Sequence, residues 1–245
     1  MSKRPHWVGE VAIVAFLLVI YDLVAGLARV RPEDAIAHGR SLLALSPDGF
    51  ERAADHWLAG VHVLWAPSAY YYDLAHINVT MAVFIGAYVW RAPIYRRARS
   101  ALLVVNLIGL AVFWLYPAAP PRLLPDGGFV DIVSQSGTWG SYEASGEVGE
   151  RANAFGSMPS LHLAWAVWVA LTVMTMTTRP VWRALGWAHV AMTAVVVIIT
   201  GNHYLVDLGA GAATALVAWV AVRRTQPAEA HSDLTATLQA SSQPV

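Results

Sequence analysis

Long runs of apolar residues, separated by short charged or Pro/Gly-containing stretches, constrain the fold of this chain more than any other feature. A bilayer core about 30 Å thick is crossed by roughly 20 apolar residues in a helix. Six runs approach or reach that length, at residues 7–27, 69–90, 100–116, 159–177, 181–200 and 203–222. Because lipid offers no partners to backbone polar groups, these runs predict an all-α integral membrane protein with six transmembrane helices.

The composition agrees with a membrane protein and excludes several kinds of chemistry. The chain is 57% hydrophobic and 13% charged, which is unusual for a soluble domain. Its formal net charge is zero, so it lacks the basic field of nucleic-acid-binding proteins, and we expect no nucleic-acid partner. It has no cysteine, which excludes disulfides, thiolate catalysis and cysteine metal sites. Any catalysis must therefore use histidine, carboxylates, arginine and hydroxyl groups.

Basic residues mark one set of span ends. They lie before the first run, between the second and third, between the fourth and fifth, and after the sixth, at residues 3–4, 91–99, 179–183 and 223–224. The positive-inside rule makes this face cytoplasmic. No small-residue cleavage site follows the first run, which predicts a retained span. We therefore expect a cell-membrane protein with both termini in the cytoplasm and residues 117–158 on the extracytoplasmic face.

Three regions follow from this pattern: a first span with its outer connection (1–48), a main membrane domain (49–225) and a polar tail (226–245). Within the main domain, residues 49–65 are too short and too charged to span a bilayer, yet they carry apolar side chains near helical spacing. This pattern predicts an interfacial helix on the outer face. The tail has too little apolar surface to fold, and we expect it to be disordered.

Three separate segments bring polar residues to the outer ends of the spans. Arg122 follows the third span in YPAAPPRLLP, Ser160 and His162 open the fourth in SMPSLHLAWA, and His203 and Asp207 open the sixth in TGNHYLVDLGAG. Ionisable residues near lipid are costly, so they are functional candidates by default. Their convergence on one face predicts a common site.

The residue types in this cluster suit chemistry on phosphate. His203 and Asp207 are spaced i, i+4, so a carboxylate could orient the imidazole for nucleophilic attack, although a structural ion pair or helix cap explains the pair equally well. His162 alone is more simply an interfacial histidine. Arg122 offers a planar cation and Ser160 a hydroxyl, and two helix N-termini facing one pocket would favour an anion. Together they predict a phosphate site with one histidine to attack and one to protonate the leaving oxygen.

In these segments the sequence resembles the type 2 phosphatidic acid phosphatase superfamily. PSLH at 159–162 and HYLVD at 203–207 match its second and third motifs in order, and PPR at 120–122 matches part of the first. The first motif lacks its upstream lysine, Leu161 replaces a glycine, and Val197 stands in place of the third motif's arginine. These departures, together with YYYDLAHINV in the second span, resemble the branch that includes inositol phosphorylceramide synthases. The resemblance covers about residues 49–222 and makes 49–225 the catalytic domain.

The resemblance implies a role for each residue of the cluster. His203 would attack phosphorus, Asp207 would orient it, His162 would act as general acid, and Arg122 with Ser160 would hold the phosphoryl oxygens. It implies a phospholipid or polyprenyl phosphate substrate and a reaction that uses no metal or other cofactor. Transfer to water would make the protein a lipid phosphate phosphatase. Transfer to a polyol or lipid hydroxyl would make it a headgroup transferase.

Three further residues are candidates for contact with substrate or acceptor. Asp73 and His76 lie i, i+3 on one face of the second span and could contact the hydroxyls of an acceptor, although a buried structural pair explains them equally well. Arg151, in the long outer loop at 126–151, could replace the missing arginine of the third motif, although it is more simply a solvated charge. The loop itself is expected to shape the choice of lipid.

Two rival functions differ in class from this one. A metal hydrolase could use His, His and Asp as zinc ligands, but an adjacent arginine makes a poor cation site. A lipid transporter or scaffold would need polar residues along a path through the membrane, whereas those in the spans are sparse. The phosphohistidine mechanism requires a neutral His203 and a protonated His162, so it predicts a bell-shaped pH profile.

Overall fold

The computed structural model describes residues 5–29, 31–47, 49–137 and 154–225. Within these ranges the chain forms helices and no strand; Ala118 and Gly156 alone form an isolated β-bridge. The all-α prediction is therefore confirmed. The polar tail and Arg151 lie outside the described residues.

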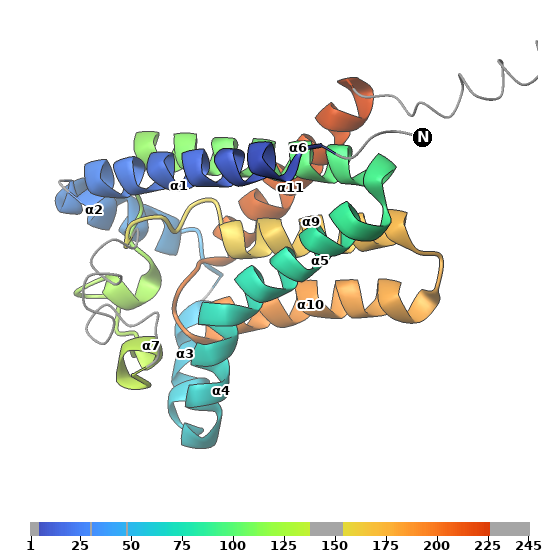
Figure 1. Ribbon diagram of the computed structural model, residues 1–245. Helices are drawn as coiled ribbons and strands as arrows, with labels where there is room; N and C mark the ends of the chain where they lie inside the picture. The colour runs from blue at the N-terminus through green and yellow to red at the C-terminus, as the bar shows by residue number, and fades with distance from the viewer. Residues whose placement is uncertain (1–4, 30, 48, 138–153, 226–245) are drawn as a thin grey trace, which may run out of the picture.

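The helices follow one another in a simple order (Figure 1). They are α1 Trp7–Arg29, α2 Pro32–Leu43, α3 Phe50–Ala59, η1 His62–Leu64, α4 Trp65–Tyr70, η2 Tyr71–Ala75, α5 His76–Trp90, α6 Ala92–Leu115, η3 Pro121–Leu123, α7 Ile132–Gln135, α9 Leu161–Met176, α10 Pro180–Ile199 and α11 Leu205–Thr225. The segment η2 is one turn of π-helix between α4 and α5.

Five helical segments are long and apolar enough to cross a membrane: Trp7–Leu27, His62–Trp90, Pro93–Leu115, Pro180–Ile199 and Leu205–Thr225. Five of the six predicted runs thus correspond to candidate spans. The remaining run, at 159–177, forms α9, which has 16 residues. At 1.5 Å per residue this helix is about 24 Å long, shorter than the bilayer core of about 30 Å. The count of six spans therefore stays a prediction.

Helix α9 lies at the centre of the bundle and packs against α5, α6, α10 and α11. It is apolar on all sides, and most of its residues from Leu163 to Thr172 are buried. A helix without a polar face is stable only where neighbours surround it. Its partners contribute Val105 from α6, Val197 from α10 and Leu208 from α11 to one core cluster. The short central helix is thus held by its neighbours along its length.

A buried ion pair attaches α1 to the outside of this bundle. Glu10 accepts hydrogen bonds from Arg99, at 2.5 Å, and from the Tyr95 hydroxyl, at 2.6 Å, both on α6. Two donors on one carboxylate offset part of the cost of removing its charge from water. The first span is therefore anchored by a polar contact as well as by apolar packing.

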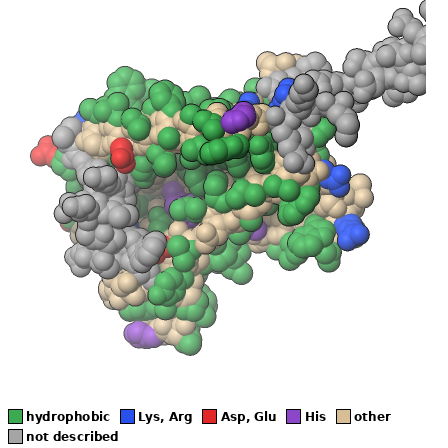
Figure 2. Space-filling view, in the orientation of Figure 1, with side chains coloured by type: hydrophobic (Ala, Val, Ile, Leu, Met, Phe, Trp, Pro, Cys, Tyr) green, Lys and Arg blue, Asp and Glu red, His purple; other side chains and the backbone are tan. Residues whose placement is uncertain are grey.

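The two ends of the bundle differ in their side chains. The junctions α5–α6 and α9–α10, the start of α1 and the end of α11 lie at one end (Figure 1). Figure 2 shows Lys and Arg side chains at that end and Asp and Glu side chains toward the other, near α2. The apolar surface between them carries no comparable cluster of charge on the face shown. The grouping of basic connections matches the sequence prediction; which end faces the cytoplasm stays a prediction.

The segment expected to be an interfacial helix is partly helical and turns acidic side chains inward. Within α3, Glu51, Asp55 and Leu58 are buried, whereas Phe50 and Trp57 are half exposed. These three buried residues are spaced i, i+4, i+7, so one face of α3 packs on the protein with two carboxylates in it. The second candidate span begins at His62, earlier than the predicted residue 69. The placement of α3 at a membrane surface stays a prediction.

Candidate active site

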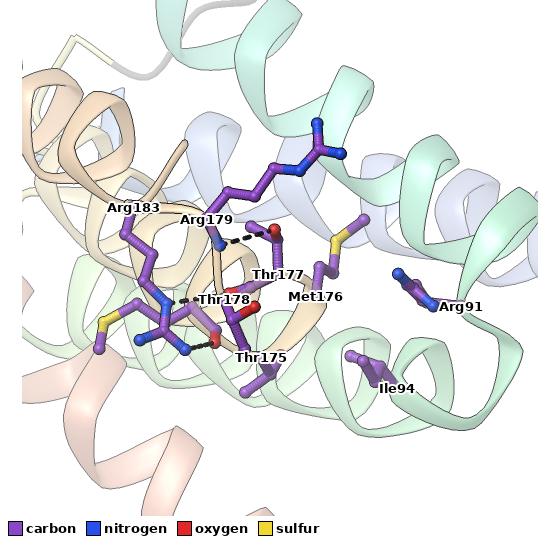
Figure 3. Close-up of a pocket in the computed structure, with 9 residues that line it drawn as sticks. Arg91, Ile94, Thr175, Met176, Thr177, Thr178, Arg179 and Arg183 are labelled. Atoms are coloured by element: carbon purple, nitrogen blue, oxygen red, sulfur yellow. Dashed lines mark hydrogen bonds between the residues drawn. The ribbon is translucent and has the colours of Figure 1, made fainter. Parts of the chain in front are cut away.

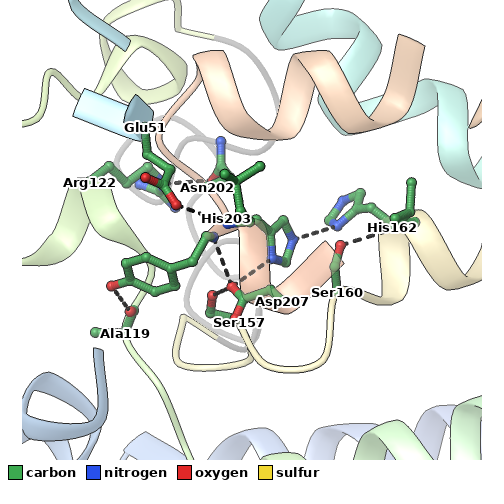
Figure 4. Close-up of polar contacts among 12 residues, drawn as sticks. Glu51, Ala119, Arg122, Ser157, Ser160, His162, Asn202, His203 and Asp207 are labelled. Carbon is green, nitrogen blue, oxygen red and sulfur yellow. Dashed lines mark hydrogen bonds and ion pairs between the residues drawn. The ribbon is translucent and has the colours of Figure 1, made fainter. Parts of the chain in front are cut away.

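His203 lies between two partners at one end of the bundle (Figure 4). Its Nδ1 is 3.4 Å from Oδ2 of Asp207, and its Nε2 is 3.3 Å from Nδ1 of His162. The histidine precedes α11, which begins at Leu205, so it stands in the turn before the helix rather than in its first turn. The structure thus brings together the three residues predicted to be catalytic.

For a neutral His203, the form that nucleophilic attack requires, the hydrogen-bond partners assign the proton positions in this chain of groups. A carboxylate only accepts, so His203 carries its proton on Nδ1 and presents a lone pair at Nε2. The Nδ1–H of His162 then donates to that lone pair. The contact of 3.4 Å between Nδ1 of His203 and Oδ2 of Asp207 is longer than an ordinary hydrogen bond. The arrangement leaves Nε2 of His203 as the nucleophilic atom, with a proton donor beside it.

Asp207 is held by two groups in addition to His203. The Ser157 hydroxyl and the backbone N–H of Tyr204, the latter at 3.0 Å, both donate to the same Oδ2. Sequence reasoning missed Ser157, because it lies 50 residues from Asp207 and has no diagnostic spacing. Three donors on one oxygen fix the direction of the carboxylate.

His162 is surrounded by aromatic rings from the second candidate span. Tyr72 stacks on it with ring centroids 4.5 Å apart, and the ring of His76 lies 4.2 Å away at an angle of 60°. The Nδ1 of His76 is 2.9 Å from the backbone oxygen of Tyr72 and donates to it. Tyr72 lies within the π-helical turn η2 and His76 directly follows it; such a turn often occurs at functional sites. Thus His76 joins the site through His162, whereas Asp73 lies half-buried in η2.

Arg122 is buried and bonded to the protein. Its Nε donates to Oδ1 of Asn202 at 2.8 Å, and one terminal nitrogen donates to Asp131 at 2.6 Å. Since Asn202 directly precedes His203, the guanidinium is tied to the loop that carries the nucleophile. Sequence reasoning missed both partners, although the position of Asn202 inside the TGNHYLVD stretch is a signal that could have identified it. Arg122 is therefore preorganised beside the histidines, with its charge partly neutralised.

Ser160 is fully buried and serves as the N-cap of α9. Its Oγ accepts a hydrogen bond from the backbone N–H of Leu163 at 3.3 Å, and its own N–H donates to the Asp207 backbone oxygen at 3.1 Å. The turn before α9 approaches α11 closely at Gly211, where a Cβ would lie 2.3 Å from the Ser160 carbonyl oxygen. The hydroxyl hydrogen remains available as a donor while the oxygen accepts.

The start of α11 is occupied by a protein carboxylate. Glu51 of α3 accepts a hydrogen bond from the N–H of Leu205 at 3.0 Å. This differs from the expectation that two helix N-termini face one phosphate pocket, because Glu51 already accepts the hydrogen bond of the first N–H of α11. One turn further, Asp55 accepts from the N–H of Val130 at 2.8 Å, and burial raises the pKa of Asp55 to about 6. The two carboxylates place negative charge near the nucleophile loop.

Val197 and Arg151 concern the arginine that the third motif lacks in this chain. Val197 is buried in the core, and its backbone oxygen accepts hydrogen bonds from the N–H groups of Asn202 and His203, each at 3.1 Å. It therefore shapes the nucleophile turn through its backbone. Arg151, the suggested replacement, lies outside the described residues. Within the described part of the chain, no group of three or more His, Asp or Glu side chains is arranged to hold a metal ion.

Comparison with known proteins identifies the family. Residues 49–221 match the PAP2 superfamily. The chain belongs to this superfamily. Phosphoinositol dihydroceramide synthase of Bacteroides thetaiotaomicron is 32% identical to the chain over 138 residues, which is 51% of this chain and 45% of that protein. The match thus covers less than half the length of this synthase. No solved structure matches the chain.

The comparisons confirm the resemblance drawn from PSLH, HYLVD and PPR. The matched range includes all three motifs and the YYYDLAHINV segment, and it begins within one residue of α3. The similarity to a phosphoinositol dihydroceramide synthase agrees with the inositol phosphorylceramide synthase-like branch of PAP2 proteins. Membership therefore covers the part of the chain in which the histidine site is built.

Proposed function

We propose that this PAP2 protein transfers a phosphoryl or phosphodiester group from a lipid-linked phosphate through a covalent intermediate on His203. The observation that carries the proposal is the alignment of Asp207, His203 and His162, with contacts of 3.4 and 3.3 Å on opposite sides of the central ring. This is the arrangement of an orienting carboxylate, a nucleophile and a proton donor. Family membership supports the same reaction class.

In the first step, Nε2 of His203 forms a bond to phosphorus, and the bond from phosphorus to the leaving oxygen breaks. His162, which enters this step protonated on both ring nitrogens, gives one proton to that oxygen and becomes neutral. The Nδ1–H of His203 stays on the ring and donates to the carboxylate of Asp207, which stabilises the developing positive charge of the ring. Arg122 and the Ser160 hydroxyl hold the phosphoryl oxygens, where charge stabilisation contributes most to catalysis.

In the second step, an acceptor oxygen bonds to phosphorus as the bond to Nε2 breaks, and the acceptor's proton passes to His162. If water is the acceptor, the products are those of a lipid phosphate phosphatase. If a polyol or lipid hydroxyl is the acceptor, the reaction is headgroup transfer. The similarity to a phosphoinositol dihydroceramide synthase favours transfer as the second candidate.

His76 acts through its ring contact with His162 in this proposal, and it positions the general acid. Its ring approaches His162 within 4.2 Å, and its bond to the Tyr72 carbonyl fixes its orientation. Asp73 and Arg151 remain candidates for contact with the acceptor or with the phosphate. We place the site on the extracytoplasmic face of the cell membrane, with both termini cytoplasmic, on the basis of the positive-inside rule. The cysteine-free chain suits single-cysteine labelling to test this orientation.

The test uses purified protein in excess chelator, with lipids carrying radioactive phosphorus. We expect the wild type to release phosphate or transfer the headgroup and to acquire an acid-labile label on protein. His203→Ala should lose both activities and the label. His62→Ala is the control, because His62 is exposed and stacks on Trp65, away from the three site residues. Equal activity in wild type and His203→Ala would refute the site; loss of wild-type activity in chelator would favour a metal mechanism.

A further inference from the structure

A polar cavity lies at the end of the bundle opposite to the histidine site (Figure 3). Its volume is about 430 Å³, within the range of small-molecule sites. It opens between the end of α5, the start of α6 and the α9–α10 connection, with lining residues Arg91, Ile94, Met174, Thr175, Met176, Thr177, Thr178, Arg179 and Arg183. The lining thus combines three arginines with threonines and apolar side chains, and it contains no acidic residue.

The three arginines differ in what they already bind. Arg183 donates to the backbone oxygens of Thr177 at 2.9 Å and Met174 at 3.0 Å, so it caps the end of α9. The guanidinium groups of Arg91 and Arg179 form no hydrogen bond or ion pair with any residue that the structure describes. Figure 3 shows these two side chains on either side of Met176. Both exposed cations line one cavity that has no acidic residue, so each would attract an anion bound there.

The local backbone adds to the positive potential. Helix α10 begins at Pro180, directly after Arg179, and an α-helix carries a partial positive charge at its N-terminus. The hydrogen bonds of Arg183 neutralise carbonyl groups at the end of α9, which would otherwise oppose an anion. The charge balance of the cavity therefore favours a phosphate group rather than a cation.

The position of the cavity determines which phosphate can reach it. The exposed side chains of Trp90 and Trp182 lie at the ends of the same helices, where tryptophans mark the membrane surface. Ile94, Met174 and Met176 offer an apolar wall beside the arginines. Basic pockets between membrane helices bind lipid headgroups. An anionic phospholipid presents both a phosphate and an apolar body at this depth.

We propose that this cavity binds the phosphate headgroup of an anionic phospholipid in the leaflet opposite to the active site. Arg91 and Arg179 contact the phosphate oxygens, Arg183 holds the α9–α10 connection that carries one of them, and the methionines contact the glycerol and upper acyl carbons. The site is distinct from the histidine cluster, and its occupancy does not depend on the proposed reaction. Since it joins α5, α6, α9 and α10, a bound lipid would stabilise their packing.

The test compares thermal stability in neutral detergent as dioctanoyl phosphatidylglycerol is added. We expect the wild type to be stabilised, and the double variant R91A/R179A to bind about thirtyfold more weakly, from the loss of two arginines near the membrane surface. R223A/R224A is the matched control, because it removes the same charge from the same end of the bundle, on exposed residues outside the cavity. It should bind as the wild type does.

Parallel titrations with dioctanoyl phosphatidylcholine and inorganic phosphate identify the ligand. The proposal requires that phosphatidylcholine bind at least tenfold more weakly than phosphatidylglycerol and that inorganic phosphate fail to reproduce the stabilisation. Equal stabilisation by inorganic phosphate would overturn the assignment to a lipid. Unchanged affinity in R91A/R179A, or equal losses in the two double variants, would overturn the site. Repeating the titration in His203→Ala separates this binding from substrate binding at the histidines.

Discussion

Gly211 provides a sharp test of how closely the two histidine-bearing segments are fitted together. A Cβ at this position would lie 2.3 Å from the Ser160 carbonyl oxygen, whereas real Cβ atoms essentially never approach another heavy atom within 3.0 Å. Gly211→Ala must therefore move α11 away from the turn before α9 by about 1 Å. That turn leads directly to His162, and His203 lies two residues before the first residue of α11.

The expected loss of activity follows from this displacement. The contact between His162 and His203 is 3.3 Å, and the Ser160 N–H bonds the Asp207 backbone oxygen at 3.1 Å, so neither survives a shift of about 1 Å unchanged. A misplacement of this size costs about 100-fold in rate. Overpacking also destabilises by about 1–3 kcal/mol, offset by about 1 kcal/mol from replacing a helical glycine.

The assay measures kcat/KM for the lipid substrate and the melting temperature in detergent, for Gly211→Ala and Gly209→Ala. Gly209 lies on the same helix, and a Cβ added there would meet no atom within 4 Å, so its alanine variant gains helix propensity without a clash. We expect near wild-type activity for Gly209→Ala and about 1% for Gly211→Ala. Equal activities in the two variants would refute the argument that close fit between α9 and α11 sets the histidine geometry.

Two further predictions concern the carboxylates around the site. Asp131→Asn removes the charge that pairs with Arg122 at 2.6 Å and so leaves the guanidinium free to bind phosphate. A partly exposed ion pair contributes about 1 kcal/mol, so KM for the lipid phosphate should fall roughly threefold to tenfold. A higher KM would mean that Asp131 holds Arg122 in place. Burial raises the pKa of Asp55 to about 6 from 3.8, so the folded state binds the extra proton between these values and loses stability as pH rises from about 4 to 6. Asp55→Asn should flatten the melting temperature over this range, and an unchanged pH dependence would contradict the shift.

The sequence was sufficient for the parts of the fold that depend on local pattern. The apolar runs predicted the candidate spans because a helix that meets lipid or a packed core must be apolar over its length. The run at 159–177 shows the limit of this argument. Hydropathy cannot distinguish a membrane span from a helix buried by protein, and α9 has 16 residues with neighbours on every side.

The sequence could indicate the candidate catalytic residues because PSLH and HYLVD carry them at fixed spacing, but it could not indicate their supporting contacts. Glu51 meets Leu205 across 154 residues of sequence, and Ser157 reaches Asp207 from a separate turn. Neither contact leaves a periodic signal, since each depends on how the helices pack. The same is true of His76, whose spacing from Asp73 suggested a pair on one helix face, while its ring in fact packs on His162.

The charges around the nucleophile bear on which phosphate the site accepts. Within the described part of the chain, Arg122 is the one arginine beside the histidines, and Asp131 already pairs with it. Glu51 and Asp207 add two further carboxylates near the nucleophile loop. A phosphomonoester carries a charge of about −1.5 to −2 at pH 7, whereas a phosphodiester carries about −1. Because each added negative charge raises the repulsion in a site of limited dielectric, we expect this geometry to favour a phosphodiester donor over a phosphomonoester, whichever acceptor follows.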